Sequence, residues 1–439
     1  METRLAYGKN GLTVHIPDQN LAGIVHMNPA EPLSNPVAAI QDSLNSPIAS
    51  PPLAEIARGR KSAVIVISDI TRPVPNQMIL PPMLKTIEDA GVPREEITIL
   101  IATGIHRPNL GDEMIELVGH EVASRYNVVN HYSEDPEANE FIGMVCGDIP
   151  VYLNKHYLKA DLKILTGLVE LHLMAGFSGG RKAVLPGIAS LETMKHMHGY
   201  RLIQMDDVCN GKLAGNPFHE AAVQVARSAG VDFILNVTLD EERRITGVFA
   251  GELEAAHERA CALIEQVALV EIEEEVDIVV TCGGGYPLDK TMYQTIKGQV
   301  AALEAVKPNG TIIIAARNEE GCGSREFTDL LRRLQNPMEF YDLTMQPNYI
   351  AKDQWMIQEL VNGLHHAELL YYSEGISDED LRDFLVKPIS SVEEGIQQAL
   401  QRHGSDARIL VIPEGPYVMP KIKGRTKKMY SWQSSGTAV

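Results

Sequence analysis

The chain has 439 residues, of which 44% are hydrophobic and 22% are charged, a composition typical of two or three well-packed domains. Its formal net charge of -19 would repel a phosphate backbone, so general nucleic-acid binding is disfavoured. An anionic small-molecule substrate would need a local cluster of Arg and Lys side chains.

The N-terminal segment lacks the apolar stretch of a signal peptide, and no apolar run is long enough to span a membrane. The chain has 5 cysteines, which are widely spaced and form no CxxC pair. This pattern disfavours a disulfide framework or a zinc ribbon and is typical of a reducing compartment. We therefore expect a cytoplasmic protein with no membrane partner.

Apolar β-branched runs alternate with helical stretches from residue 53 onward. The strand-like runs cover 62–68, 97–103 and 162–167, and the spacing of apolar residues predicts a helix over Pro81–Ala90. This alternation predicts an α/β fold with a mostly parallel sheet that is covered on both faces. Residues 233–251 then predict an antiparallel hairpin.

An acidic stretch over Glu265–Glu275 precedes a second α/β pattern, with strand-like runs at 277–285, 311–316, 365–373 and 408–415. We therefore predict two α/β domains, an N-terminal one over 1–270 and a C-terminal one over 276–413. The basic tail over 414–439 either returns to the N-terminal domain or is poorly ordered.

Polar residues follow directly on four of the strand-like runs. They are Asp69 and Arg72 after the first run, His106 after the second, His172 after the third, and a glycine-rich turn over 283–286 after the fourth. Each alone is typical of an ordinary turn. Because ligands of open α/β sheets bind beyond the carboxyl ends of the strands, the signals together predict one shared site.

A glycine-rich segment over 176–187, GFSGGRKAVLPG, has two interpretations. Its backbone N–H groups, with Ser178, Arg181 and Lys182, could form an anion cradle whose lysine is close enough to react. It could equally be a tight turn that carries a solvated basic pair. The spacing excludes a Walker A motif.

A short helix is predicted over Ser190–Gly199. Leu191, Met194 and His198 fall on one face of it, so His198 is expected to turn inward and His196 to face water. An inward histidine is either a packed core residue or a ligand, and the spacing does not decide between them.

A second predicted helix carries Tyr293, Gln294 and Lys297 as near neighbours. They could project together into a cleft, or they could form an ordinary exposed helix end. Trp355 either lines the same cleft or packs in the core.

Five blocks together resemble the nickel-dependent lactate racemase family. They are SDITRPVP (68–75), TGIHRP (103–108), HLMAGFSGGRKAVLPG (172–187), His198 and GGYPLDKTMYQTIKG (284–298). Their order and spacing are specific, and the resemblance extends from about Leu53 to about Pro413.

The resemblance implies an isomerase with two α/β domains, an active site in the cleft between them, and a nickel pincer nucleotide. This cofactor is a nickel-bearing pyridinium-3,5-bisthiocarboxylic acid mononucleotide, made by dedicated synthesis enzymes and linked covalently to Lys182. His198 is the implied nickel ligand, and His106 and His172 are the implied catalytic acid and base. The implied cofactor contacts are Asp69, Ile70, Thr71, Arg72, Ser178, Gly179 and Gly180, and the implied substrate contacts are Tyr293, Gln294, Lys297 and again Arg72.

The implied reaction inverts C2 of a 2-hydroxy acid. The adjacent carboxylate makes loss of the C2 proton difficult, whereas removal of hydrogen as hydride avoids a carbanion. Two histidines then manage the hydroxyl proton for the two enantiomers. Ile70 and the pair Leu173 and Met174 depart from the family pattern, so the substrate could be lactate, malate, a longer 2-hydroxy acid or a sugar acid.

Two other classes of function stay open at this point. A metal-dependent hydrolase or phosphotransferase would use the SGGRK segment for phosphate, but no carboxylate pair follows a strand to hold its metal. A non-catalytic carrier or sensor of the cofactor would not need both His106 and His172, which are present.

Overall fold

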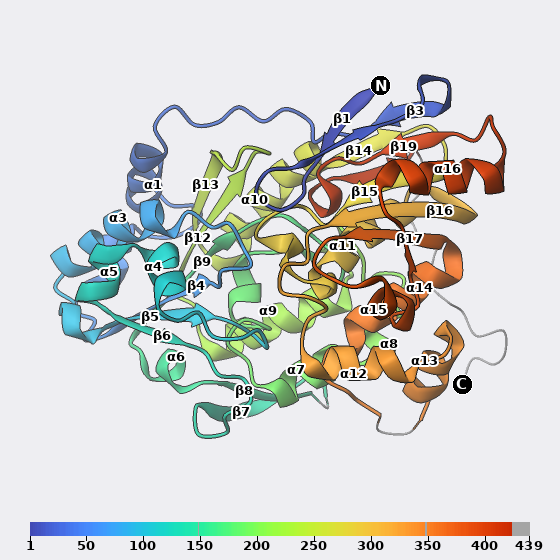
Figure 1. Cartoon of the computed structure of the whole chain (residues 1–439). Coiled ribbons are helices and arrows are strands. Elements are labelled where there is room, and N and C mark those ends of the chain that lie inside the picture. Colours follow the sequence, from blue (N-terminus) through green and yellow to red (C-terminus); the bar gives the residue numbers. More distant parts are fainter. Residues whose placement is uncertain (148, 347–348, 424–439) are drawn as a thin grey trace. The chain divides into compact units, whose positions relative to one another are not determined.

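A computed structural model describes residues 1–147, 149–346 and 349–423 (Figure 1). The chain divides into two compact units. The N-terminal unit contains residues 29–197 and 210–265, and the C-terminal unit contains residues 1–28, 198–209 and those from 266 onward.

A 6-stranded sheet forms the centre of the N-terminal unit. Neighbouring strands in this sheet are parallel except for the pair at one edge, β12 and β13, which forms the predicted antiparallel hairpin. The mostly parallel α/β fold is therefore confirmed. The strands, in sheet order, are β13 (Ile245–Gly251), β12 (Phe233–Leu239), β9 (Leu162–Leu168), β4 (Ala63–Ser68), β5 (Ile97–Ala102) and β6 (Asn127–Asn130).

Helices and two small hairpins complete this unit. The helices are α1 (Pro36–Asn45), α2 (Leu53–Ala57), α3 (Asn76–Asp89), α4 (Asp112–Val118), α5 (His120–Arg125), α6 (Lys155–Lys159), α7 (Leu191–Met197), α9 (Pro217–Ala229) and α10 (Leu253–Ala268). The hairpins are β7 (Asn139–Val145) with β8 (Ile149–Asn154), and β10 (Leu171–His172) with β11 (Gly176–Phe177). Single-turn helices are η2 (Arg94–Glu96) and η3 (Gly180–Ala183).

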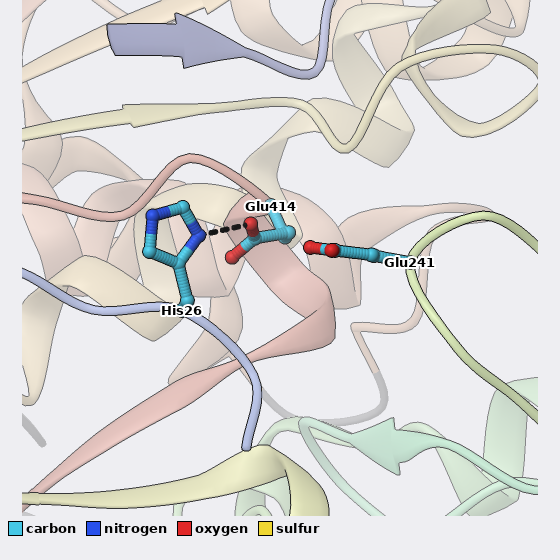
Figure 2. A group of neighbouring side chains, drawn as sticks. All are labelled: His26, Glu241 and Glu414. Carbon is cyan, nitrogen blue, oxygen red and sulfur yellow. Dashed lines mark hydrogen bonds and ion pairs between the residues drawn. The ribbon is translucent and has the colours of Figure 1, made fainter. Parts of the chain in front are cut away.

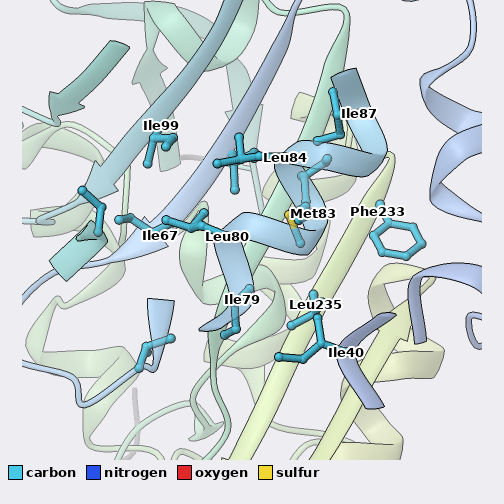
Figure 3. Packing of buried hydrophobic residues seen from close by; sticks show 14 of the residues in the cluster. Ile40, Ile67, Ile79, Leu80, Met83, Leu84, Ile87, Ile99, Phe233 and Leu235 are labelled. Carbon is cyan, nitrogen blue, oxygen red and sulfur yellow. The ribbon is translucent and has the colours of Figure 1, made fainter. Parts of the chain in front are cut away.

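The alternation of side chains along β4 explains why both faces of the sheet are covered. Ile65 and Ile67 join the cluster of Figure 3, whereas Val64 and Val66 point to the opposite face, and all four are fully buried. Helix α3 contributes an apolar stripe that packs on the first of these faces: Ile79, Leu80, Met83, Leu84 and Ile87. Each such side chain contributes about 1.5–3 kcal/mol through burial.

The C-terminal unit contains a second 6-stranded sheet, in which every neighbouring pair is parallel. Its strands, in sheet order, are β18 (Lys387–Pro388), β17 (Glu368–Ser373), β16 (Val306–Ala316), β15 (Val276–Cys282), β19 (Ile409–Val411) and β3 (Leu21–Ile24). Two further pairs are β1 (Glu2–Leu5) with β2 (Leu12–His15), which is antiparallel, and β14 (Leu269–Ile272) with β20 (Met419–Ile422), which is parallel.

The helices of the C-terminal unit are mostly inserted between its parallel strands. They are α8 (Tyr200–Ile203), α11 (Met292–Leu303), α12 (Arg325–Arg333), α13 (Pro337–Thr344), α14 (Gln354–His366), α15 (Asp378–Asp383) and α16 (Val392–His403). Single turns are η1 (Asp18–Asn20), η4 (Leu288–Lys290) and η5 (Gly415–Tyr417).

The division of the chain differs from the predicted boundaries at 1–270 and 276–413. Residues 1–28 and 198–209 fall in the C-terminal unit. The first of these segments does so because β3 pairs with β19, and because Leu5 and Val14 share a hydrophobic cluster with Ile278. Local sequence patterns do not reveal such long-range pairing.

The predicted tail over 414–439 is only partly described. Its first residues form η5 and then β20, which pairs with β14 inside the C-terminal unit rather than with the N-terminal one. Residues 424–439 lie outside the described residues.

The cysteines and the longer helices of the described residues bear on disulfide bonding and membrane spanning. All five cysteines are described, and none of them forms a disulfide. No helix in the described ranges combines the length and the apolar character needed to cross a membrane.

Buried histidines should make the stability of the protein depend on pH. His131 is 1% exposed; its Nε2 donates to Ala189 O over 2.9 Å and its Nδ1 accepts from Asn154 over 3.1 Å. Burial lowers the pKa of His131 from 6.5 to about 4. In the unfolded chain this histidine therefore becomes protonated near pH 6.5, whereas in the folded chain it does so only near pH 4. The free energy of unfolding falls as the pH drops between these two values.

We expect this effect of His131 to reach roughly 3 kcal/mol by about pH 4. Denaturant titrations between pH 7 and pH 4.5 should show a shallower acid loss for His131→Gln than for the unmodified chain. Equal slopes for the two proteins would contradict the assignment.

Candidate active site

The three strands that carry the predicted N-terminal site residues lie side by side. Strand β4 pairs with β5 on one side and with β9 on the other, all parallel. Their carboxyl ends therefore meet at one edge, where Asp69 follows β4, His106 follows β5, and His172 follows β9. The structure thus brings three of the four predicted strand-end signals to one sheet edge. The fourth, the turn over 283–286, follows β15 in the separate sheet of the C-terminal unit.

Asp69 and His106 form a carboxylate–imidazole pair. Asp69 Oδ2 lies 2.6 Å from His106 Nδ1, and Asp69 Oδ1 accepts from the hydroxyl of Thr71 over 2.6 Å. Burial alone would raise the pKa of Asp69, but the charge of His106 and the hydrogen bonds from His106 and Thr71 outweigh it and hold the pKa below 3.8. The ionised carboxylate places the proton of His106 on Nδ1, so that Nε2 carries the lone pair of the neutral ring.

Ile70 and Arg72, from the same loop, have partners of their own. Ile70 is 9% exposed, and its N–H donates to the Asn109 side chain over 3.2 Å. Arg72 Nε lies 3.0 Å from Glu170 Oε1, with both side chains largely buried. The charge of Arg72 is therefore balanced by Glu170, whose second oxygen, Oε2, is buried and has no partner among the described residues.

His172 and Lys182 lie next to each other. In the β10–β11 hairpin, His172 Nδ1 accepts the backbone N–H groups of Met174 over 3.2 Å and Ala175 over 3.1 Å. Its Nε2 lies 2.8 Å from Lys182 Nζ. A primary amine and an imidazole thus stand in direct contact at the same strand ends.

The glycine-rich segment is not a turn with a solvated basic pair, because Arg181 is 1% exposed. Burial lowers the pKa of Arg181 to about 10. Its guanidinium donates to Ala175 O over 2.6 Å and lies 2.9 Å from His257 Nε2, which donates to Ser178 O over 2.8 Å. Other donors of the segment also bind protein atoms: Ser178 Oγ donates to Leu168 O over 2.8 Å, and Gly180 N donates to Asn236 Oδ1 over 2.9 Å. These contacts hold the loop that carries Lys182.

Gly179 leaves no room for a side chain in this loop. Its φ is +76°, and an added Cβ would lie 2.7 Å from Val169 Cγ2 and 3.1 Å from Asn236 Oδ1. Gly59 offers a matched control, with φ +78° and nothing within 4 Å of an added Cβ.

We expect Gly59→Ala to cost about 1–2 kcal/mol through the left-handed backbone alone. Gly179→Ala should cost about 1–3 kcal/mol more, because the added methyl overpacks its surroundings. Urea titration of both variants measures the difference. Equal costs would show that the loop has room to move.

Three supporting residues escaped the sequence analysis: Glu170, Asn236 and His257. Asn236 could have been noticed, because it is a fully buried amide within the apolar run of β12. His257 lies on α10, far along the chain from Arg181, and no local spacing indicates their contact. Glu170 follows shortly after β9, but nothing in the sequence indicated Arg72 as its partner.

The C-terminal unit holds the predicted substrate residues on the first turns of α11. The helix begins after Thr291, whose hydroxyl caps it by accepting from Gln294 N over 3.4 Å. Gln294 is 6% exposed and Lys297 is partly buried. Tyr293 Oη accepts from Trp355 Nε1 over 2.7 Å, so Trp355 packs beside a predicted site residue.

His198 does not belong to the helix that was predicted over Ser190–Gly199. Helix α7 ends at Met197, so the common face with Leu191 does not orient His198. His198 is 5% exposed and its ring centroid lies 4.6 Å from that of Trp355. Its inward position therefore comes from packing in the C-terminal unit. His196 pairs with Glu192 over 3.3 Å and is partly exposed, as expected.

Another histidine, His26, lies outside the motifs from which the site was predicted. Its Nδ1 lies 2.7 Å from Glu414 Oε1 (Figure 2). The side chain of His26 is 53% exposed, whereas that of Glu414 is 12% exposed, so this contact joins a surface imidazole to a largely buried carboxylate.

Comparison with known proteins supports the resemblance. Residues 7–208 match the family model of the lactate racemase N-terminal domain, and residues 272–419 match that of the lactate racemase C-terminal domain. A lactate racemase from Lactiplantibacillus plantarum is 36% identical over 422 residues, which are 95% of this chain and 99% of that protein. One from Thermoanaerobacterium thermosaccharolyticum is 33% identical over 423 residues, with the same coverage of 95% and 99%.

Solved structures give the same picture. The lactate racemase apoprotein from Thermoanaerobacterium thermosaccharolyticum matches with a TM-score of 0.89 and 33% identity, covering 96% of this chain and 100% of that chain. A protein from Thermotoga maritima, at 20% identity and a TM-score of 0.70, covers 90% of this chain and 100% of its own, and it shows the shared fold alone.

The fold and these matches define an isomerase of the racemase class, as the five sequence blocks predicted. They do not support the hydrolase or phosphotransferase alternative. The chain belongs to the lactate racemase family.

Proposed function

We propose that this racemase inverts C2 of a 2-hydroxy acid by reversible hydride transfer, with a nickel pincer nucleotide attached to Lys182. The observation that carries the proposal is the location of two imidazoles beyond the carboxyl ends of three neighbouring parallel strands, with the Lys182 amine in contact with one of them. The proposal includes a supply of the cofactor by its synthesis enzymes.

The residues present fit such a group. Lys182 offers a primary amine for a thioamide link, and the imidazole of His198 is a ligand type that suits nickel. Asn76, in the segment that follows Arg72, is 1% exposed, and neither polar atom of its amide has a partner among the described residues. A buried amide without partners costs about 1–3 kcal/mol, which a polar ligand would relieve.

The proposed roles of the residues depend on one chemical property of the cofactor. When bound, this group supplies an acceptor for the hydride of C2. His106, held by Asp69, takes the hydroxyl proton of one enantiomer through Nε2, and His172 is the acid/base partner for the other. Lys297 and Gln294 bind the substrate carboxylate, and their charge and amide fix its orientation.

Inversion follows because removal of hydride and hydroxyl proton leaves a planar 2-keto acid. This keto acid can present its other face before hydrogen returns. Imidazoles suit both proton transfers because their ordinary pKa lies close to neutral pH.

The relatives are named lactate racemases, and lactate is the substrate we propose first. Ile70, Leu173 and Met174 are buried apolar side chains beside Asp69 and His172 in the sequence. Apolar surroundings would penalise the second carboxylate of malate or 2-hydroxyglutarate. A polarimetric screen of lactate, malate, 2-hydroxyglutarate and gluconate distinguishes these substrates.

A reaction in deuterium oxide tests the chemistry of inversion. We expect the racemised product to keep its original hydrogen at C2, because a transferred hydride does not exchange with solvent. Mass spectrometry or proton NMR of the product gives the isotope content. Solvent deuterium appearing at C2 in step with inversion would instead show proton abstraction and would remove the hydride proposal.

A further inference from the structure

We propose that His172 holds the Lys182 amine in its neutral, nucleophilic form in the cofactor-free chain, and that attachment of the cofactor then releases His172 for catalysis. The inference rests on the proposed function, since it concerns how the cofactor becomes attached. It assigns His172 a second role, as the residue that prepares the lysine.

The tautomer of His172 is set by the hairpin that carries it. Nδ1 accepts two backbone N–H groups, from Met174 over 3.2 Å and from Ala175 over 3.1 Å. A ring nitrogen that accepts hydrogen bonds carries a lone pair and no proton. The single proton of the neutral imidazole is therefore on Nε2.

This Nε2–H points at the amine of Lys182, 2.8 Å away. An ammonium group has three donors and no acceptor, so it cannot accept from Nε2–H. If a charged Lys182 donated instead, both ring nitrogens of His172 would have to lack protons, which makes an imidazolate. The contact is a hydrogen bond only if Lys182 is a neutral amine.

Arg181 reinforces this arrangement from the next position in the chain. Its guanidinium donates to Ala175 O over 2.6 Å, and Ala175 N donates to His172 Nδ1. The buried cation of Arg181 also opposes a second positive charge in its neighbourhood. Burial and the charge of Arg181 likewise lower the pKa of His219 and of His257. The ring of Phe218, 5.8 Å from Lys182 Nζ, would favour the ammonium only weakly.

The chemical class that such an amine would take is an aromatic thiocarboxylic acid. The amine attacks the carbonyl carbon, a C–N bond forms, and the carbonyl oxygen leaves as water with one proton from the amine and one from the thioacid. The product is a thioamide, and no oxidant or reductant is needed. The nitrogen lone pair of a thioamide is delocalised and is a poor acceptor, so Nε2–H of His172 no longer donates to Lys182 and can donate to the substrate oxygen.

Nitrogen NMR of the full, cofactor-free chain tests the inference directly. Lysine labelled at Nζ and ring-labelled histidine report the two groups, and Lys182→Arg and His172→Phe assign the signals. At pH 7 we expect a neutral-amine shift for Lys182 and the Nε2–H tautomer for His172. An ammonium shift for Lys182, or a proton on Nδ1 of His172, would overturn the inference.

Trace acylation with acetic anhydride at pH 7, read by peptide mapping, provides a second measurement. Relative to exposed Lys159, Lys182 should react at least about 10-fold faster, because an ordinary lysine is almost fully protonated at this pH. His172→Phe should remove that advantage, whereas His156→Phe, at an exposed histidine of α6, should keep it. Equal rates in the unmodified chain and His172→Phe would refute the role of His172.

These results are separable from those for the proposed function, because neither measurement uses the cofactor. If Lys182 is charged in the cofactor-free chain and still acquires the cofactor, only the inference is contradicted. If Lys182 is neutral and never acquires the cofactor, only the proposed function is contradicted.

Discussion

Lys182→Ala, produced together with the enzymes that make the cofactor, should carry no covalent adduct and should lose racemase activity by at least about 10³-fold. The physical reason is that a tether holds the reacting group beside the imidazoles at a very high effective concentration. Lys182 Nζ lies 2.8 Å from His172 Nε2, so the link starts within contact distance of one proposed base. Intact mass, peptide mapping and polarimetry measure the two effects.

Lys159→Ala is a suitable control for this variant. Lys159 is an exposed lysine on α6 of the same unit, and its loss should leave both the adduct and the rate unchanged. The cofactor assignment fails if the unmodified chain is fully active while its Lys182 peptide has an unmodified mass. It also fails if Lys182→Ala retains an adduct and a normal rate.

His106→Asn should lower kcat by about 10²–10⁴-fold while the cofactor stays attached to Lys182. Asparagine keeps a polar side chain but cannot exchange a proton near neutral pH. Because each enantiomer needs its own base, loss of one base stops inversion in both directions at equilibrium. The rate is measured by polarimetry, and attachment by intact mass of the same sample.

Asp69→Asn separates the positioning of His106 from proton transfer itself. The carboxylate of Asp69 fixes the Nδ1–H form of His106 over 2.6 Å, and an amide would no longer favour that tautomer. The variant should therefore lower kcat with an altered pH profile, even though His106 is still present. His120→Asn, on α5, should leave the rate unchanged. A normal rate in His106→Asn would exclude it as a base.

Much of the fold could be predicted because short segments of the sequence carry the apolar patterns of its strands and helices. The runs that became β4, β5 and β9 are continuously apolar since both faces of their sheet are covered, and a strand pattern of this kind is readable locally. The rule that ligands bind beyond the carboxyl ends of parallel strands then brought Asp69, His106 and His172 to one edge. Neither step needed knowledge of long-range contacts.

The pairing of side chains could not be predicted in the same way. His106 meets Asp69, Arg72 meets Glu170, and Lys182 meets His172, and each pair depends on which strands are neighbours and on how a loop turns back. The order of strands in a sheet leaves no periodic signal in the chain. The burial of Arg181 by His257 and the placement of residues 1–28 in the C-terminal unit have the same origin.

The sequence by itself thus determined the α/β class, the resemblance to one family and the set of candidate site residues, because each depends on local pattern or on motifs. Only the tertiary structure decided which groups contact the ring nitrogens of His106 and His172 and which charge each carboxylate balances. Protonation and pairing are set by atoms within about 3 Å of each other, and such distances arise only when segments far apart in the chain are packed together.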